Sequence, residues 1–268
     1  MTIRFTSEEI KADRIGNKGF ALYRMSQADL PVPACFYVSV DRMDTIAISD
    51  IETVLARLGG ERVAVRSSAV GEDTSAASFA GIYVTRLNVR NASGVREALE
   101  EVRDSVLKPA ATAYRRMRGI TTPPQIAAIV QRFINADASG VIFTADPLTG
   151  SDNIIVEGCW GLGEASASGA VTPDRWVLSR NGRMLSSTVS DKDVAMVADE
   201  TEGTKQVEVD VHRRRHPCLT PGLLQRLMEL AIDCERLFGS PQDIEWAVES
   251  NHVWLLQSRP ILTPYSTT

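Results

Sequence analysis

Two kinds of hydrophobic spacing alternate along the chain, and together they predict a mixture of helices and strands. Apolar residues recur every three or four positions after Gly19, after the expected cap residues Ser49 and Ser93, and after Thr220-Pro221, which is typical of helices with one buried face. Short apolar or alternating runs predict strands between these helices. The expected strands span residues 35–40, 62–66, 82–89, 125–134, 141–145, 153–157, 176–179 and 184–189. We therefore expect an α+β fold.

The last alternating stretch predicts a hairpin that turns near Ser250-Asn251 and carries a stripe of polar side chains. Asp243 and Glu245 alternate with apolar residues before the turn, and Gln257 and Arg259 follow it. Because side chains of a strand alternate between two faces, Glu245 is expected to share a face with Gln257 only if the turn contains an odd number of residues. The carboxylate and amide oxygens would then suit Mg²⁺, and the guanidinium would suit phosphate oxygens. From these residues alone, an edge hairpin with one solvated face is the alternative.

Composition and charge narrow the class of protein. The 268 residues suit one large or two small domains, and 44% hydrophobic with 24% charged residues is typical of a globular protein. The formal net charge of −5 argues against a dominant nucleic-acid surface, although an anionic ligand can still sit in a locally basic pocket. The four cysteines lack C-x-x-C spacing, the N-terminus is charged where a signal peptide would be apolar, and no run approaches the ~18 apolar residues of a membrane span. We expect a reduced cytoplasmic protein without a membrane contact.

The run Thr121-Thr122-Pro123-Pro124 marks the expected boundary between two lobes. Helical patterns dominate before it, whereas strand patterns dominate after it. We therefore expect an N-terminal lobe over residues 1–120 and a C-terminal lobe, mainly antiparallel sheet, over residues 121–268.

Two loops in the expected N-terminal lobe carry residue types that bind phosphate. Gly16-Asn17-Lys18-Gly19 places a cation at a helix start, where backbone N–H groups and the helix dipole favour an anion, although such glycines alone often mark a turn. Arg66-Ser67-Ser68 ends a strand, and the small residues Ser78-Phe79-Ala80-Gly81 follow it. These two segments suit a loop that closes over phosphates, or a surface loop without that role.

Other familiar motifs are not expected to act here. Trp160-Gly161-Leu162-Gly163-Glu164 resembles the start of a dinucleotide fingerprint but lacks its third glycine and its βαβ unit, and no P-loop sequence is present. His212 and His216 are separated by three arginines and have no second ligand cluster, so a zinc site is not expected.

Taken together, ten ordered motifs resemble the ATP-binding domain of the family that contains phosphoenolpyruvate synthase, pyruvate phosphate dikinase and rifampicin phosphotransferase. They are GNKG (16–19), LPVP (30–33), VRSSA (65–69), ED (72–73), ASFAG (77–81), GVIFTADP (140–147), Glu157 with WGLGE (160–164), TPD (172–174), DIE (243–245) and QSRP (257–260). The resemblance spans nearly the whole chain, and the order of ten motifs is far more specific than any one of them.

The resemblance implies an ATP-grasp-like fold of two lobes that hold a nucleotide, and it implies roles for particular residues. Lys18 and Arg66 would contact phosphates, Glu245 and Gln257 would hold Mg²⁺, and Arg259 would neutralise the transferring group. The remaining cofactor-binding residues that it suggests are Ser78, Ala80 and Gly81 over the phosphates, Gln131 and Glu157 on the adenine and ribose side, and Asp243 in the polar stripe.

In this family the resemblance also implies that a phosphoryl group passes from ATP to a histidine on a separate domain, with release of AMP and phosphate. None of the histidines here matches that carrier, and the chain stops soon after Arg259-Pro260. The connection over residues 40–63 is also shorter than is usual in the family. We therefore expect the ATP-binding subunit of a split dikinase, whose partner chain carries the phosphohistidine and serves an acceptor such as a phenol or cresol. The alternatives are a fragment of a one-chain enzyme of this family and a non-catalytic nucleotide-binding regulatory module.

Overall fold

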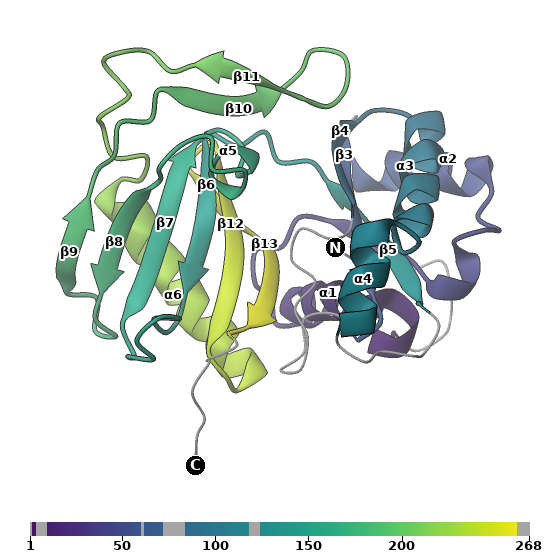
Figure 1. Cartoon of the computed structure of the whole chain (residues 1–268), viewed down its shortest axis with the longest axis horizontal. Helices are drawn as coiled ribbons and strands as arrows, with labels where there is room; N and C mark the ends of the chain where they lie inside the picture. Colours follow the sequence, from purple (N-terminus) through teal and green to yellow (C-terminus); the bar gives the residue numbers. More distant parts are fainter. Residues whose placement is uncertain (1, 4–9, 60–61, 72–83, 118–123, 262–268) are drawn as a thin grey trace. The chain divides into compact units, whose positions relative to one another are not determined.

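The computed structural model describes residues 2–3, 10–59, 62–71, 84–117 and 124–261. The chain forms two compact units, and neither is continuous in sequence. Unit 1 consists of Met1–Ser26, Pro33–Phe133 and Glu200–Gly203, and unit 2 consists of Gln27–Val32, Ile134–Asp199 and Thr204–Thr268. Both units contain helices and sheet, so the expected α+β class is confirmed (Figure 1).

Unit 1 is built on a five-stranded sheet in the order β1 (Thr2–Ile3), β2 (Cys35–Val38), β5 (Ile126–Arg132), β3 (Val63–Ala69) and β4 (Thr85–Val89). The β1–β2 pair is parallel and the other pairs are antiparallel. The expected boundary at residue 120 differs from this arrangement, because β5 pairs with both β2 and β3 at the centre of the first sheet. Hydrogen bonds to strands far away in sequence place β5 in unit 1, and a Pro-rich run in the sequence cannot predict such pairing.

One face of the unit 1 sheet is apolar and packs against two helices, α2 (Ile48–Leu58) and α3 (Ala92–Ser105). Phe36, Val65 and Val130 belong to this core and are at most 4% exposed. Each helix begins one residue before the serine that the sequence suggested as its cap. The residue before α2 is Ala47, and Asn91 caps α3 by accepting a hydrogen bond from Gly94 N at 2.8 Å. The short elements η1 (Val40–Arg42) and α4 (Pro109–Met117) complete the described part of the unit.

The other face of this sheet carries polar side chains. Because side chains alternate along a strand, Tyr37 on β2, Gln131 on β5, and Arg66 and Ser68 on β3 lie on the face opposite to the α2 and α3 core. Helix α1 (Ala12–Gln27) contacts this face through a hydrogen bond between Gly19 N and Ser68 Oγ. The two faces of one sheet therefore separate the hydrophobic core from the residues that the sequence suggested for phosphate binding.

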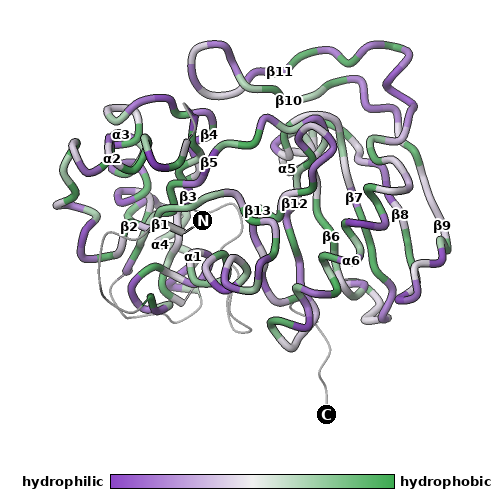
Figure 2. Tube along the Cα trace, turned by 180° about the vertical axis from the view of Figure 1, so that it is seen from behind, coloured by the Kyte–Doolittle hydropathy of each residue, from purple (hydrophilic) through white to green (hydrophobic). Residues whose placement is uncertain are grey.

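Unit 2 is built on a six-stranded antiparallel sheet, whose central strands are largely hydrophobic in Figure 2. Its order is β13 (His252–Pro260), β12 (Gln242–Glu249), β6 (Ala138–Phe143), β7 (Ile154–Trp160), β8 (Asp174–Leu178) and β9 (Met184–Thr188). Helix α6 (Pro221–Phe238) covers one face (Figure 1), where Ile244, Trp246 and Leu255 are fully buried. Thr220 caps this helix and Gly239 ends it in a left-handed conformation, as the sequence predicts.

Three short elements of unit 2 were not predicted. They are α5 (Glu164–Ala167) and the hairpin formed by β10 (Val194–Ala198) and β11 (Thr204–Glu208). The polar run around these strands gave little periodic signal, because most side chains of β11 are exposed. Among the described residues, no helix has the length and apolar character that a membrane span requires.

Candidate functional site

The terminal hairpin places its four polar residues on one face of the unit 2 sheet, by a route that the sequence did not suggest. Asp243 lies opposite Arg259, and Glu245 lies opposite Gln257. The condition that the turn must contain an odd number of residues is wrong: the turn consists of two residues, Ser250 and Asn251, both with positive φ. A β-bulge beyond Trp246 leaves Leu256 without an opposite residue, and this extra residue restores the register that a two-residue turn alone would have lost.

The same face continues across the neighbouring strands. Glu245 lies opposite Val141 on β6, Val141 lies opposite Glu157 on β7, and Glu157 lies opposite Arg175 on β8. Arg175 Nη1 is 3.6 Å from Glu157 Oε1. Since adjacent strands are about 4.8 Å apart, Glu157 lies roughly 10 Å from Glu245, far enough to contact a different part of one ligand. Glu157, suggested for the nucleotide, thus shares a face with the metal-binding candidates.

Arg259 is held in place by Asp243. Arg259 Nε donates to Asp243 Oδ2 at 2.8 Å, and Arg259 Nη2 lies 2.8 Å from the same oxygen. The two side chains are 29% and 13% exposed, so solvent screens this pair less than an ordinary surface pair. Asp243 therefore orients the guanidinium, and its carboxylate oxygen Oδ2 is paired with Arg259.

Glu245 and Gln257 offer oxygen atoms of the kind that Mg²⁺ prefers. Gln257 is 7% exposed and faces the half-buried Glu245 directly. Among the described residues, no group of three or more histidine, cysteine or acidic side chains is arranged to hold a metal ion. Two protein ligands nevertheless fit Mg²⁺, because this ion is commonly held by one or two carboxylates together with substrate phosphates and water.

In unit 1, Lys18 lies just after a break in helix α1. Gly16 has φ 70° and ψ 166°, a conformation available essentially only to glycine, and it divides the element into a first turn and a helix over residues 17–27. The expected helix start at this motif is therefore present as an interruption inside α1. Lys18 lies in the first turn after the break, where the positive end of the helix dipole favours anions.

Arg66 and Gln131 lie on adjacent strands close to a buried thiol. Cys35 lies directly opposite Gln131, and burial raises the pKa of Cys35 to about 12, while hydrogen bonding by Gln131 and the positive charge of Arg66 lower it in part. Gln131 is 2% exposed, and its Nε2 has no ordinary hydrogen-bond acceptor among the described residues, since the neighbouring sulfur is a weak one. A buried donor of this kind fits a ligand that brings an oxygen or ring nitrogen.

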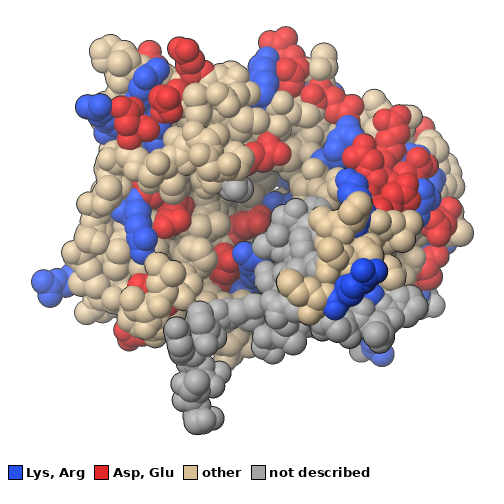
Figure 3. Space-filling model, in the orientation of Figure 1, with Lys and Arg blue, Asp and Glu red and all other residues tan. Residues whose placement is uncertain are grey.

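Charge on the opposite side of unit 1 would repel a polyphosphate. Figure 3 shows acidic side chains gathered over α2 and α3, where Glu97, Glu100 and Glu101 are exposed. Lys18 on α1 and Arg66 on the polar face of the sheet both lie away from these helices. Ser78, Ala80 and Gly81 lie outside the described residues. The structure therefore brings together Arg66 and Gln131 in unit 1, and Asp243, Glu245, Gln257, Arg259 and Glu157 in unit 2.

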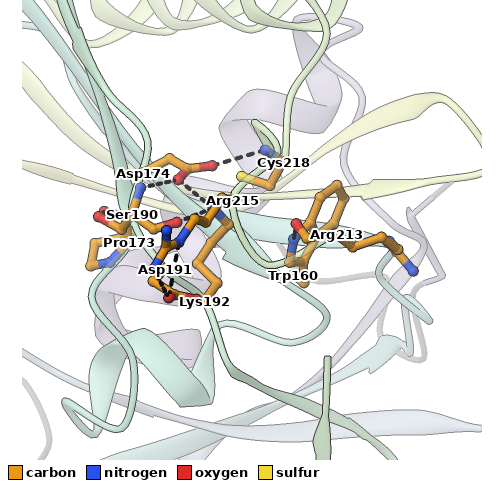
Figure 4. A network of polar contacts seen from close by, with 9 residues as sticks. All are labelled: Trp160, Pro173, Asp174, Ser190, Asp191, Lys192, Arg213, Arg215 and Cys218. Atoms are coloured by element: carbon orange, nitrogen blue, oxygen red, sulfur yellow. Dashed lines mark hydrogen bonds and ion pairs between the residues drawn. The ribbon is translucent and has the colours of Figure 1, made fainter. Parts of the chain in front are cut away.

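Sequence reasoning missed a buried ion pair that supports the unit 2 sheet (Figure 4). Asp174 and Lys192 are both 0% exposed, and Lys192 Nζ contacts Asp174 Oδ1. Asp174 also accepts hydrogen bonds from Ser190 N and Cys218 N, each at 2.9 Å. The pair thus joins the start of β8 to two loops. The motif TPD pointed to Asp174, whereas Lys192 lies in a polar run that reads as an ordinary loop.

The segment with three arginines is also structural in its contacts. Arg213 stacks over the Trp160 ring at 4.3 Å, Trp160 Nε1 donates to Arg213 O, and Arg215 pairs with Asp191 (Figure 4). These contacts attach the segment to β7 and to the loop before Lys192. Among the described residues, no cluster of three or more histidine, cysteine or acidic side chains lies here.

Comparisons with known proteins place this arrangement in a family. Among solved structures, the D-alanine–D-alanine ligase from Bacillus anthracis aligns over 92% of this chain and 58% of its own with a TM-score of 0.45 and 9% identity. That similarity is too weak to argue from. The probable phosphoenolpyruvate synthase of Methanothermobacter thermautotrophicus is 38% identical over 225 residues, which are 82% of this chain and 33% of that protein. The rifampicin phosphotransferase of Streptomyces sviceus is 39% identical over 230 residues, which are 82% of this chain and 26% of that protein.

The chain thus spans about a quarter to a third of the length of these curated relatives. The family model described as the AMP/ATP-binding domain of pyruvate phosphate dikinase matches residues 45–267. That range includes Arg66, Gln131, Glu157 and the terminal hairpin. The chain therefore belongs to the family of the pyruvate phosphate dikinase AMP/ATP-binding domain.

Proposed function

We propose that this chain is the ATP-binding subunit of a split dikinase-type phosphotransferase. In the proposed reaction ATP, a histidine of a partner chain and one water give phosphohistidine, AMP and phosphate, and the phosphohistidine then serves an acceptor such as a phenol or cresol. The observation that carries the proposal is the polar face of the terminal hairpin, where Glu245 faces Gln257 and Asp243 orients Arg259. Membership of an AMP/ATP-binding domain family supports the nucleotide as ligand.

The chemistry of the hairpin suits a metal-bound polyphosphate. Glu245 and Gln257 would hold Mg²⁺, which neutralises phosphate charge when it is bound. Arg259, already directed by Asp243, would place its guanidinium against phosphate oxygens, where charge develops during phosphoryl transfer. Phosphoryl transfer needs positioning and charge neutralisation rather than a nucleophile from this chain, so the absence of a carrier histidine motif is consistent with the proposal.

Unit 1 carries further residues that we propose for nucleotide binding. Lys18 at the helix start and Arg66 on β3 would bind phosphates, and the buried Gln131 amide would donate to the base or sugar. Each of these residues lies on α1 or on the polar face of its sheet, away from the acidic outer surface of α2 and α3. The second expected alternative, a regulatory module, would need a nucleotide but neither a transfer group nor a partner.

The proposal is tested by incubating the purified chain with Mg²⁺ and ATP labelled on the β-phosphate, with and without the protein encoded beside it. We expect label on a histidine of the partner, together with AMP. Glu245→Ala and Arg259→Ala should each reduce this transfer at least about 100-fold and leave the far-ultraviolet circular dichroism unchanged, because both side chains lie on the face away from α6.

Two exposed residues of α6 provide matched controls: Glu229→Ala and Arg236→Ala remove the same charges and should retain full transfer. Unchanged transfer in both hairpin variants would rule out the proposed roles. Tight ATP binding without any transfer would instead favour the regulatory module. Transfer to a histidine on a further segment of the same longer chain, but not to the neighbouring protein, would favour a piece of a one-chain enzyme.

A further inference from the structure

The hydroxyl of Ser68 occupies the place of a missing helical hydrogen bond in α1. In a continuous helix Gly19 N would donate to Ile15 O, because these residues are four apart. Instead Gly19 N donates to Ser68 Oγ at 2.9 Å, and Ser68 Oγ donates to Ile15 O at 2.6 Å. Ser68 is 0% exposed, so no solvent competes for these groups. A side chain inserted into the hydrogen-bond ladder is one of the few established causes of a helix break.

Gly16 makes this insertion sterically possible. A Cβ at Gly16 would lie 2.2 Å from Ser68 O and 2.3 Å from Ser68 Oγ, far inside van der Waals contact. The combination of φ 70° and ψ 166° at Gly16 is also one that residues with a side chain rarely adopt. A second tie joins the two segments, because Asn17 Oδ1 accepts a hydrogen bond from Gly71 N at 3.4 Å, just after β3. The motifs GNKG and VRSSA, which are about fifty residues apart in sequence, therefore form one local structure.

We propose that Ser68 is a positioning residue for polyphosphate binding. It fixes the helix start that carries Lys18 against the strand that carries Arg66, two residues away on the same face as Ser68. This inference rests on the proposed binding of ATP. Without the hydroxyl, Gly19 N can donate to Ile15 O as in a continuous helix. Helix α1 can then adopt a conformation without the break, in which the Lys18 side chain points in a different direction. Loss of Ser68 should therefore weaken phosphate binding more than it disturbs folding.

The test compares binding of ATP in the presence of Mg²⁺ with binding of adenosine, by titration calorimetry, in the wild-type chain and in Ser68→Ala. We expect the Kd for ATP to rise about tenfold or more in the variant, because one cation at a phosphate is misplaced. The Kd for adenosine should change less than about twofold, because adenosine has no phosphate. Ser67→Ala is the matched control: Ser67 is adjacent, 3% exposed and on the other face of β3, and this variant should bind ATP as the wild type does.

Ser68→Cys provides a second variant of similar shape with a much weaker hydrogen-bonding group, and it should show the same selective loss. Wild-type affinity for ATP in both Ser68 variants, or an equal loss of ATP and adenosine binding, would overturn the positioning role. A wild-type chain that binds adenosine but gains no affinity from the phosphates would contradict the proposed function itself. A loss of ATP affinity without a loss of adenosine affinity, seen in the Ser68 variants and not in Ser67→Ala, would support both the positioning role and the proposed function.

Discussion

At the scale of single residues, the structure separates charged groups that meet a ligand from those that hold the fold. Arg259 and Asp243 are partly exposed, whereas Asp174 and Lys192 are completely buried. The second pair has no access to a ligand, and its three further hydrogen bonds join it to Ser190 and Cys218, which are both parts of the unit 2 framework. Residue type alone does not distinguish these cases, because both are ion pairs of an aspartate with a basic side chain.

The buried pair should dominate the stability of unit 2. Asp174→Asn leaves the Lys192 ammonium buried without a counter-charge, so we expect the free energy of unfolding in urea to fall by about 3–5 kcal/mol. Arg215→Ala breaks an exposed pair nearby, with side chains 80% and 46% exposed, and should cost no more than about 1 kcal/mol. If both variants lose the same small amount of unfolding free energy, the Lys192 ammonium is reached by water in Asp174→Asn and the prediction is wrong. Asp174→Asn combined with Lys192→Met should recover part of the lost stability.

At the scale of elements, the terminal hairpin illustrates how local irregularities set a functional register. Alternation along β12 and β13 predicted two strands and their polar residues, but the opposing residues depend on the turn and on the bulge at Leu256. The bulge is not encoded by a glycine or proline in this segment. It is decided by the buried side chains on the other face, since Trp246 opposite Leu255 and Ile244 opposite Ser258 all pack on the α6 side.

The turn of this hairpin is expected to limit its stability. Ser250 and Asn251 have φ of 49° and 65°, the conformation of a type I′ turn, which favours Asn-Gly. The double substitution Ser250→Asn, Asn251→Gly should raise the free energy of unfolding by about 0.5–1 kcal/mol, because a left-handed conformation costs serine more than it costs these residues. Ser250→Val should lower it by about 1–2 kcal/mol at this exposed position. Urea denaturation measures both, and two shifts of the same sign would contradict this account of the turn.

At the scale of the whole molecule, each unit has its own core, and all four cysteines are free and buried. Burial raises the pKa of Cys35 in unit 1 to about 12 and the pKa values of Cys159 and Cys234 in unit 2 to about 11, from an ordinary value of 9.0. Burial raises the pKa of Cys218 further still. The thiols are therefore protonated and inert at neutral pH.

This burial predicts a loss of stability in alkaline solution. Well below pH 9 the thiols are neutral in both states and contribute no pH dependence. Above pH 9 the unfolded chain loses thiol protons that the folded chain retains, so the free energy of unfolding should fall as pH rises toward 11, by up to about 1.4 kcal/mol per pH unit for each thiol. Urea midpoints at pH 7.5, 9 and 10.5 test this, and Cys234→Ala should show a shallower decline. A midpoint that stays constant up to pH 10.5 would refute it.

The sequence was sufficient for most elements and for the family. Periodicity located α2, α3, α6 and most strands, because one buried face imposes a local repeat on each of them. Polar residue types in ordered motifs pointed to Lys18, Arg66, Glu245, Gln257 and Arg259, and the family itself is confirmed by a match over residues 45–267. Their individual roles stay predictions. The short strands β10 and β11 were not predicted, because exposed side chains give no hydrophobic repeat along the chain.

What the sequence determined by itself is therefore most of the elements, the family and the chemical types available at the site, all of which depend on local spacing or on ordered motifs. Only the tertiary structure decided which distant segments meet. Strand β5 belongs to unit 1 because it pairs with β2 and β3. Ser68 Oγ donates a hydrogen bond to Ile15 O of α1, and Lys192 forms an ion pair with Asp174. The physical reason is that each of these contacts satisfies buried hydrogen-bonding or charged groups across long sequence separations, and such partners leave no periodic trace in the chain.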